Sequence, residues 1–169
     1  GHNLYANENK RNTHYGLGIY KSTDGGESWK PTGLSFVQTD FEESLICDVM
    51  VHPTNYNIVV AATTTGFYYS DNSGLSFTKT QEGLFWDLKR LPNGVNELFA
   101  STGWVNQYDW GQAEILRSTD YGKTWNAATV PFAKTKEVQR IELATSKSAP
   151  NKVYALATDS SKWQPGAAF

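Results

Sequence analysis

One segment of the sequence combines residue types that suit a sugar-binding site. In "STGWVNQYDW", Trp104, Tyr108 and Trp110 fall within seven positions, and Asp109 lies between two of the rings. Aromatic planes can stack against the C–H faces of sugar rings, while a carboxylate accepts hydrogen bonds from sugar hydroxyls. The segment is therefore a candidate ligand-binding loop. The alternative is a structural loop that folds its own rings onto neighbouring elements.

A second candidate segment, "VQTDFEES", carries Asp40 and Glu42. Carboxylates on two neighbouring loops could form the acid and base pair of a glycosidase, at a separation of roughly 5 to 10 Å that depends on the mechanism. They could equally be solvated loop charges, and we assign no catalytic residue. No spacing of His, Cys and carboxylate residues matches a zinc site, so we expect no metal and no organic cofactor.

An internal repeat sets the elements that carry these segments. The stretches "STDGGESW", "SDNSGLSF" and "STDYGKTW" begin 48 residues apart. A fixed period of this length is typical of a repeat architecture. Because the chemistry of a single loop does not explain three copies, we interpret each stretch as a structural turn. The residues assigned to the turns are Ser22, Asp24, Gly26 and Trp29; Ser70, Asn72, Gly74 and Phe77; and Ser118, Asp120, Gly122 and Trp125.

Each residue of the turn has an expected structural role. Asp24 and Asp120 can accept hydrogen bonds from backbone N–H groups of their own turn. The glycines suit a backbone position with positive φ. The final aromatic ring is expected to lie between packed sheets, where its burial is worth on the order of 2 to 3 kcal/mol.

Strand-like segments surround every turn. Runs rich in aromatic and β-branched residues end at the first serine of each turn, and other runs close with Ala61, Ala100 and Ala155. Further candidates precede these, at 45–51, 84–88 and 138–143. One repeat is thus four antiparallel strands, which matches one blade of a β-propeller. The sequence predicts an all-β fold built from such blades.

The turns resemble Asp-box (bacterial neuraminidase, BNR) repeats, whose pattern is S-x-D-x-G-x-[ST]-W. The copies at Ser22 and Ser118 match every patterned position, whereas the copy at Ser70 has Asn72 in place of the acid and Phe77 in place of Trp. The repeats are similar to those of a many-bladed group that includes sortilin-like receptors and xyloglucanases of glycoside hydrolase family 74. Asp boxes occur in propellers with unrelated activities, so this resemblance implies the fold more directly than the function.

The resemblance also bears on where the protein works. The stretch "GLGIYKSTDGGESWKPTGLSF" is similar to secreted, multi-domain proteins of Bacteroidetes-type bacteria that are exported by the type IX system. A secreted or cell-surface protein is the location that this similarity implies.

The strand count corresponds to about three blades of a larger propeller. We expect residues 1–35 to form the last three strands of one blade, 36–80 and 81–129 to form two blades, and 130–169 to form the first two strands of another. A single propeller ring usually has about 4 to 8 blades. Because cut sheets leave exposed edges, the remaining blades or additional chain are expected partners.

Loop length indicates which face binds a ligand. In a propeller, the loops between the second and third strands of a blade and the loops between blades gather opposite the Asp boxes. The segment between Ala100 and Ser118 is the longest of the first kind, and it carries the aromatic cluster. Variable loops on a regular scaffold often carry function.

Composition and charge exclude several classes of partner. The net charge is −2 and no basic cluster exists, so nucleic acid and anionic membrane are not expected partners. No apolar run approaches the roughly 20 residues of a membrane span. Cys47 is the only cysteine, which excludes an internal disulfide. Strand alternation groups it with Leu45, Val49 and Val51 and predicts a buried structural thiol.

These observations favour a non-catalytic propeller module, secreted or at the cell surface, that presents loops to a glycan or a protein. A sialidase would need three convergent arginines, whereas Arg117 precedes a turn and Arg90 and Arg140 lie in or at the ends of outer strand candidates. The alternative is a fragment of a xyloglucanase-like glycoside hydrolase, although the catalytic-aspartate context of that family is not found in this sequence.

Overall fold

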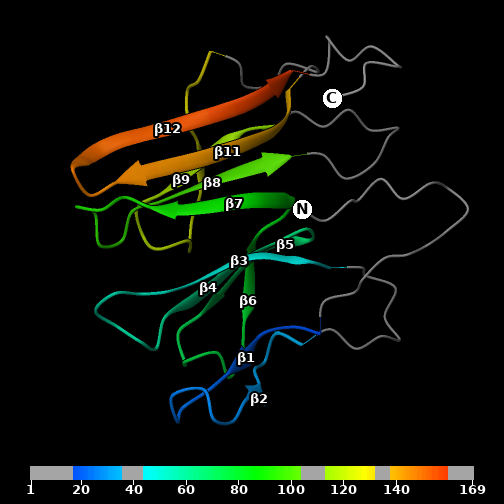
Figure 1. Cartoon of the computed structure of the whole chain (residues 1–169). Helices are drawn as coiled ribbons and strands as arrows, with labels where there is room; N and C mark the ends of the chain where they lie inside the picture. Colours follow the sequence, from blue (N-terminus) through cyan, green and yellow to red (C-terminus); the bar gives the residue numbers. More distant parts are fainter. Residues whose placement is uncertain (1–16, 36–43, 104–112, 132–137, 160–169) are drawn as a thin grey trace, which may run out of the picture.

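The computed structural model describes residues 17–35, 44–103, 113–131 and 138–159 (Figure 1). Every regular element in these ranges is a β-strand. The described residues contain no helix that is long and apolar enough to cross a membrane. The strands are β1 (Tyr20–Lys21), β2 (Lys30–Pro31), β3 (Ile46–Val51), β4 (Val59–Thr63), β5 (Gly66–Ser70), β6 (Thr78–Gln81), β7 (Leu84–Arg90), β8 (Leu98–Gly103), β9 (Ile115–Ser118), β10 (Asn126–Ala127), β11 (Val138–Ser146) and β12 (Ala149–Asp159).

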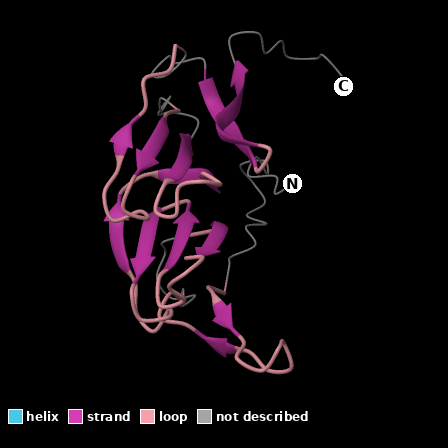
Figure 2. Ribbon diagram, turned by 90° about the vertical axis from the view of Figure 1, so that its left-hand side faces the viewer, coloured by secondary structure: helices cyan, strands magenta, loops and turns pink. Residues whose placement is uncertain are grey.

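The strands form antiparallel sheets in which neighbours in sequence are neighbours in space. Two of the described sheets have four strands, in the orders β3-β4-β5-β6 and β7-β8-β9-β10. The pairs β1-β2 and β11-β12 form two-stranded sheets. Figure 2 shows the four-stranded sheets one above the other. Four antiparallel strands in sequence order are the unit of a propeller blade, so the predicted all-β propeller architecture is confirmed.

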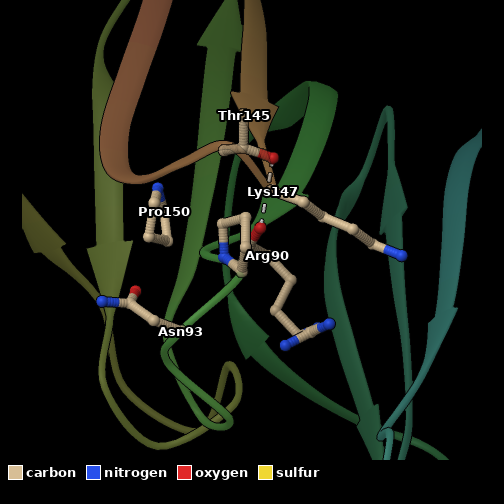
Figure 3. Close-up of a pocket in the computed structure, with 6 residues that line it drawn as sticks. Arg90, Asn93, Thr145, Lys147 and Pro150 are labelled. Atoms are coloured by element: carbon tan, nitrogen blue, oxygen red, sulfur yellow. Dashed lines mark hydrogen bonds between the residues drawn. The ribbon is translucent and has the colours of Figure 1, made fainter.

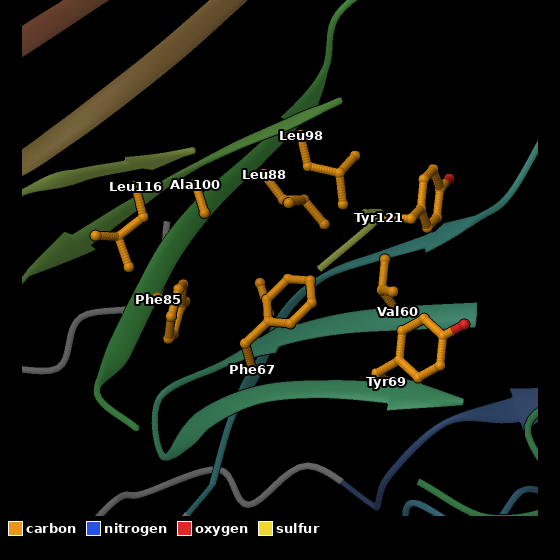
Figure 4. Close-up of a cluster of buried hydrophobic side chains, with 10 residues drawn as sticks. Val60, Phe67, Tyr69, Phe85, Leu88, Leu98, Ala100, Leu116 and Tyr121 are labelled. Carbon is orange, nitrogen blue, oxygen red and sulfur yellow. The ribbon is translucent and has the colours of Figure 1, made fainter. Parts of the chain in front are cut away.

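The main core lies between the two four-stranded sheets. Figure 4 shows Phe67 of β5 near its centre, with Phe85 and Leu88 of β7 from the neighbouring sheet around it. The centroids of the two phenylalanine rings are 5.6 Å apart, and Trp125 packs edge-on against Phe67 at 4.7 Å. Burial of each large apolar side chain is worth about 1.5 to 3 kcal/mol, so these contacts hold the sheets together.

The first strands of three successive sheets lie against one another, since β7 contacts both β3 and β11. Strands β7 and β11 run in the same direction. At the start of β11, Val138 O accepts a hydrogen bond from Ala113 N–H, which lies near the start of β9. At the end of β11, Thr145 Oγ1 donates to Arg90 O at the end of β7. Propeller blades are arranged around a central channel, and β3, β7 and β11 occupy the edge of each sheet that faces the neighbouring sheets.

This contact corrects one interpretation of the sequence. Arg90 and Arg140 were placed in outer strand candidates, but β7 and β11 are the strands at which the sheets meet. Buried polar contacts hold β11 against this sheet: Asp87 of β7 accepts a hydrogen bond of 2.7 Å from Leu143 N–H, and Ser101 Oγ of β8 donates one of 2.7 Å to Ile141 O. A buried carboxylate is stable only with such partners.

A second connection joins the two four-stranded sheets beside the third turn. Tyr121 is buried; its hydroxyl donates a hydrogen bond of 2.9 Å to Val51 O, and its ring lies 4.5 Å from that of His52. The Nδ1 atom of His52 accepts from the backbone N–H of Asn55, so Nε2 carries the proton that bonds to Asn96 Oδ1 at 2.8 Å. Burial raises the pKa of Tyr121 to about 12, which keeps the hydroxyl neutral.

Candidate functional site

The three turns are built by side-chain hydrogen bonds within about five residues. In the first, Asp24 Oδ1 accepts from Ser28 N–H at 2.9 Å and from Ser22 Oγ at 2.7 Å, and Ser22 Oγ accepts from Gly26 N–H at 2.8 Å. Hydrogen bonds from Ser28 and Ser22 hold the pKa of Asp24 below its usual value. The carboxylate is therefore occupied by its own turn.

The third turn repeats this arrangement with different residues. Asp120 Oδ1 accepts from Thr124 N–H at 2.9 Å and from Ser118 Oγ at 2.8 Å, while Gly122 N–H donates to Ser118 Oγ at 2.8 Å. Burial raises the pKa of Asp120, but the hydrogen bonds from Thr124 and Ser118 outweigh this effect and lower it. Gly122 has φ of 92°, and a Cβ there would collide with the ring of Phe67.

The second turn uses an amide in place of the carboxylate. Asn72 Oδ1 accepts from Ser76 N–H at 3.0 Å and from Ser70 Oγ at 2.9 Å. The amide nitrogen of Asn72 donates to Ser76 Oγ at 2.7 Å, in the place where Asp120 Oδ2 accepts from a hydroxyl. Gly74 N–H closes this turn on Ser70 Oγ at 3.0 Å. Asn thus makes the same set of contacts as Asp in this turn.

The final aromatic residues of the turns have different environments. Trp125 packs against the core and Phe77 is half-buried, but Trp29 is 61% exposed. The prediction that Trp29 lies between packed sheets is wrong. Its turn belongs to the two-stranded β1-β2 sheet, and no apolar cluster of the described residues includes the ring. The indole N–H bonds to Gly26 O at 3.1 Å instead.

The sequence-predicted ligand residues lie outside the described residues: Trp104, Tyr108, Asp109 and Trp110 fall in 104–112, and Asp40 and Glu42 fall in 36–43. The strand ends that flank both segments are described. Gly103, at the end of β8, pairs with Leu84, and Thr63, at the end of β4, pairs with Ile46. Both segments therefore adjoin the end of the sheets at which β3 and β7 begin.

The Asp boxes lie at the opposite end of the same sheets. Ser118, the first residue of the third box, pairs with Leu98, which also pairs with Arg90 at the end of β7. Likewise, Ser70 of the second box pairs with Val59, which pairs with Val51 at the end of β3. The strand register thus separates a box end from a loop end.

A group of charged and aromatic side chains lies along the first strands β3, β7 and β11. The guanidinium carbon of Arg140 lies 5.0 Å from the centroid of the Trp86 ring, and Arg140 Nε donates to Glu142 Oε1 at 2.7 Å. Cys47 of β3 lies within electrostatic reach of Arg140, and Asp48 lies within reach of Asp87 and Lys89. We call Cys47, Asp48, Trp86, Asp87, Lys89, Arg140 and Glu142 the inner-strand cluster.

Two groups of the inner-strand cluster have shifted pKa values. Burial raises the pKa of Asp48, and the nearby Asp87 carboxylate acts in the same direction, against the Val49 N–H and the Lys89 ammonium. Burial also raises the pKa of Cys47 to about 11, although the positive charge of Arg140 opposes the shift. These effects place charges from β3, β7 and β11 within electrostatic reach of one another.

The two aspartates of the cluster differ in their freedom to act. The Asp87 carboxylate is committed to Leu143 N–H, to Leu88 N–H at 2.9 Å and to the Lys89 ammonium. Asp48 accepts a bond of 2.8 Å from the adjacent Val49 N–H. Asp48 therefore has fewer partners than Asp87 among the described residues.

The cluster has a sequence signal that motif reasoning missed. The first strands of two successive repeats open with "LICD" and "LFWD", which place Asp48 and Asp87 at equivalent positions. The alternation expected around Cys47 is wrong, because Val49 and Val51 are 46% and 54% exposed and Cys47 is only half-buried. The register shifts between Ile46 and Asp48, which interrupts the alternation of the strand.

The arrangement suits recognition of a polar ligand with apolar faces. A half-buried indole, a guanidinium stacked on it and adjacent carboxyl groups offer an aromatic plane together with donors and acceptors. Among the described residues, no three His, Cys, Asp or Glu side chains are arranged to hold a metal ion.

Comparison with known proteins supports the propeller architecture. The family described as BNR/Asp-box repeat matches residues 20–31 and 116–127, which contain the first and third turns. A xyloglucanase from Hypocrea jecorina (strain QM6a) is 26% identical over 95 residues, which cover 50% of this chain and 11% of that protein. The crystal structure of an ancestral GH74 enzyme matches with a TM-score of 0.64 and 26% identity, over 82% of this chain and 19% of the other.

The chain is thus a BNR-repeat propeller segment related to GH74 proteins, and it spans a small part of the length of the relatives that it matches.

Proposed function

We propose that this chain supplies blades of a glycoside hydrolase-like propeller and that these blades bind a xyloglucan-type polysaccharide. The observation that carries the proposal is the contact of Arg140 with the Trp86 ring, with Glu142 bonded to the same arginine, on the first strands β7 and β11. The similarity to a xyloglucanase and to a GH74 structure supports the choice of substrate class.

The proposed contacts divide between stacking and hydrogen bonding. The Trp86 ring is held in place by Arg140 and presents an aromatic surface to a sugar ring. Arg140 and Glu142 have side chains that are 52% and 46% exposed, so their polar atoms are accessible to sugar hydroxyls.

A non-catalytic role is the first form of the proposal. Among the described carboxyl groups of the inner-strand cluster, Asp87 is occupied by three donors and Glu142 is paired with Arg140, while Asp48 accepts one bond from Val49 N–H. Hydrolysis by acid and base needs two positioned carboxyl groups. Hydrolysis is the second candidate, favoured by the xyloglucanase relative.

The proposal includes a location outside the cell and further blades. A polysaccharide is too large to cross a membrane, so its binding protein must be exported. Strand β12 pairs only with β11 among the described strands, and its free edge is suited to additional strands of a larger propeller.

Binding and hydrolysis are separated by two measurements on the same protein. Calorimetric titration with xyloglucan oligosaccharides measures affinity, and an assay for new reducing ends measures cleavage of the polymer. Binding without new reducing ends supports the non-catalytic form, and both together support the hydrolase. Absence of both refutes the proposal.

A matched pair of arginine variants tests the site. Arg140→Gln removes the guanidinium from Trp86 and is expected to weaken binding about tenfold, equivalent to about 1.4 kcal/mol. Arg117→Gln is the control: its side chain is 51% exposed, pairs with Glu97 and lies 6.0 Å from the Phe99 ring, outside the inner-strand cluster. Equal loss of affinity in both variants would contradict the assigned site.

A further inference from the structure

A pocket of about 400 Å³ lies at the box end of the molecule, where β7 and β11 end. It is lined by Arg90, Pro92, Asn93, Thr145, Lys147 and Pro150 (Figure 3). These residues come from the end of β7 and the turn after it, and from the end of β11, the turn that follows and the start of β12. The pocket is therefore formed by two neighbouring sheets at their junction.

The lining is cationic. Arg90 and Lys147 are its charged residues, and no carboxylate is among the described residues that line it. Figure 3 shows both side chains extending to the same side of the pocket. Two positive charges that share a small region repel each other, so an anion between them would be stabilised by both.

The two cations differ from other basic side chains of the described structure. Arg117 and Arg140 form ion pairs with Glu97 and Glu142, respectively. The Arg90 guanidinium donates one long hydrogen bond of 3.4 Å to Leu91 O, and the Lys147 ammonium makes no hydrogen bond or ion pair within the described part of the chain. Their donor capacity is therefore available to a ligand.

The frame of the pocket is held from both sides. Thr145 Oγ1 donates to Arg90 O at 3.3 Å, which ties the end of β11 to the end of β7. The Asn93 amide donates to the Asn151 side chain and ties the turn after β7 to the start of β12. Pro92 and Pro150 add rings with restricted backbone angles, which limit the movement of the walls. The cations are thus carried by a defined framework.

The nearby Tyr121 hydroxyl does not neutralise the positive charges of Arg90 and Lys147. Arg90 lies within electrostatic reach of Tyr121, but burial keeps that hydroxyl protonated and its hydrogen is donated to Val51 O. A guanidinium offers parallel N–H donors that match two oxygens of one anion, and an ammonium acts as a point charge.

We propose that this pocket binds a small oxyanion, with Arg90 and Lys147 as the residues that bind it. The shared ligand chemistry is a negatively charged group with two or more oxygens. A sugar acid carries it as a carboxylate, while inorganic sulfate and phosphate carry it as free ions. The pocket volume lies within the range of about 300 to 1,000 Å³ that is typical of small-molecule sites. This inference is independent of polysaccharide binding at the inner-strand cluster.

The test is calorimetric titration of the full chain with sodium glucuronate, sodium sulfate and sodium phosphate, each against sodium chloride at matched ionic strength. We expect saturable binding with one site per chain. Tighter binding of glucuronate identifies a sugar acid as the source of the anion, and tighter binding of sulfate or phosphate identifies a free inorganic ion. Failure of all three anions to bind beyond chloride would overturn the proposal.

Variants locate the binding site. Arg90→Gln and Lys147→Gln are each expected to weaken the affinity about tenfold, while Lys152→Gln, which removes an exposed cation of β12 outside the pocket lining, should leave it unchanged. Circular dichroism verifies that each variant folds. Since Lys147 is exposed, its variant tests the site even where Arg90→Gln fails to fold. Unchanged affinity in Lys147→Gln, or equal loss in Lys152→Gln, would refute the assignment.

Discussion

Replacement of Asp120 by Ala and by Asn tests how the box turn is stabilised. The carboxylate accepts from Thr124 N–H at 2.9 Å, from Thr124 Oγ1 at 2.7 Å and from Ser118 Oγ at 2.8 Å. Asp120→Ala removes both carboxylate oxygens, and with them all three hydrogen bonds, and leaves the Thr124 N–H without its partner. Because the site is near solvent and water can replace part of the loss, we expect a cost of about 1 to 3 kcal/mol in the free energy of unfolding.

Asp120→Asn should cost much less, about 0 to 1 kcal/mol. The second turn supplies the reason, because Asn72 accepts from Ser76 N–H and from Ser70 Oγ and donates its amide hydrogen to Ser76 Oγ. An amide at position 120 can make the same bonds with Thr124 and Ser118. Urea denaturation of the three proteins at pH 7 measures both differences. Equal destabilisation by Ala and Asn would refute the argument.

The free energy of unfolding of the unmodified protein and of Asp120→Asn should also differ in its dependence on pH. The pKa of folded Asp120 is lowered from its ordinary value of 3.8, so its carboxylate contributes stability above that value and loses this contribution as the pH falls through the folded pKa. Asp120→Asn has no proton to bind at this position. The difference in unfolding free energy between the two proteins should therefore shrink below pH 4, and a difference that stays constant down to about pH 2 would contradict the lowered pKa.

Two further predictions concern single positions. Gly122→Ala places a Cβ against the Phe67 ring at a backbone φ of 92°. The variant should therefore lower the free energy of unfolding, measured by urea denaturation, by about 1 to 3 kcal/mol. A neutral effect would show that the ring can move aside. The Cys47 thiol, whose pKa is raised from 9.0 to about 11, should have about a hundredfold lower thiolate fraction at pH 8 than an ordinary thiol. Its alkylation by iodoacetamide should be correspondingly slow, and a rate equal to that of a free thiol would contradict the burial.

The strands and box turns were predictable because their causes are local. Residues at 66–70 and 114–118 carry the β-branched and aromatic side chains of strands, and β5 and β9 form there. Within each box, a serine, an acid or amide and a glycine bond to one another over four positions. Contacts of such short range depend little on the rest of the fold.

The inner-strand cluster was not predictable in the same way. Asp87 bonds to Leu143, which lies 56 positions away in the sequence, and Arg140 reaches Trp86 from another sheet. These contacts exist because β7 and β11 lie side by side, which depends on the packing of whole sheets. The ligand residues that the sequence predicts lie in segments rich in aromatic or acidic residues, and those segments lie outside the described residues.

Trp29 and Trp125 show where local information ends. Both close a box of the same pattern, and the repeat alone predicts the same turn and a following strand for each, as β2 and β10 show. Burial of the ring depends on what packs beside that turn. Trp125 meets Phe67 across a sheet interface, whereas Trp29 is largely exposed beside a two-stranded sheet. Hydrogen bonding within a turn is encoded by neighbouring residues, but the removal of a side chain from water requires a second surface, which only long-range packing provides.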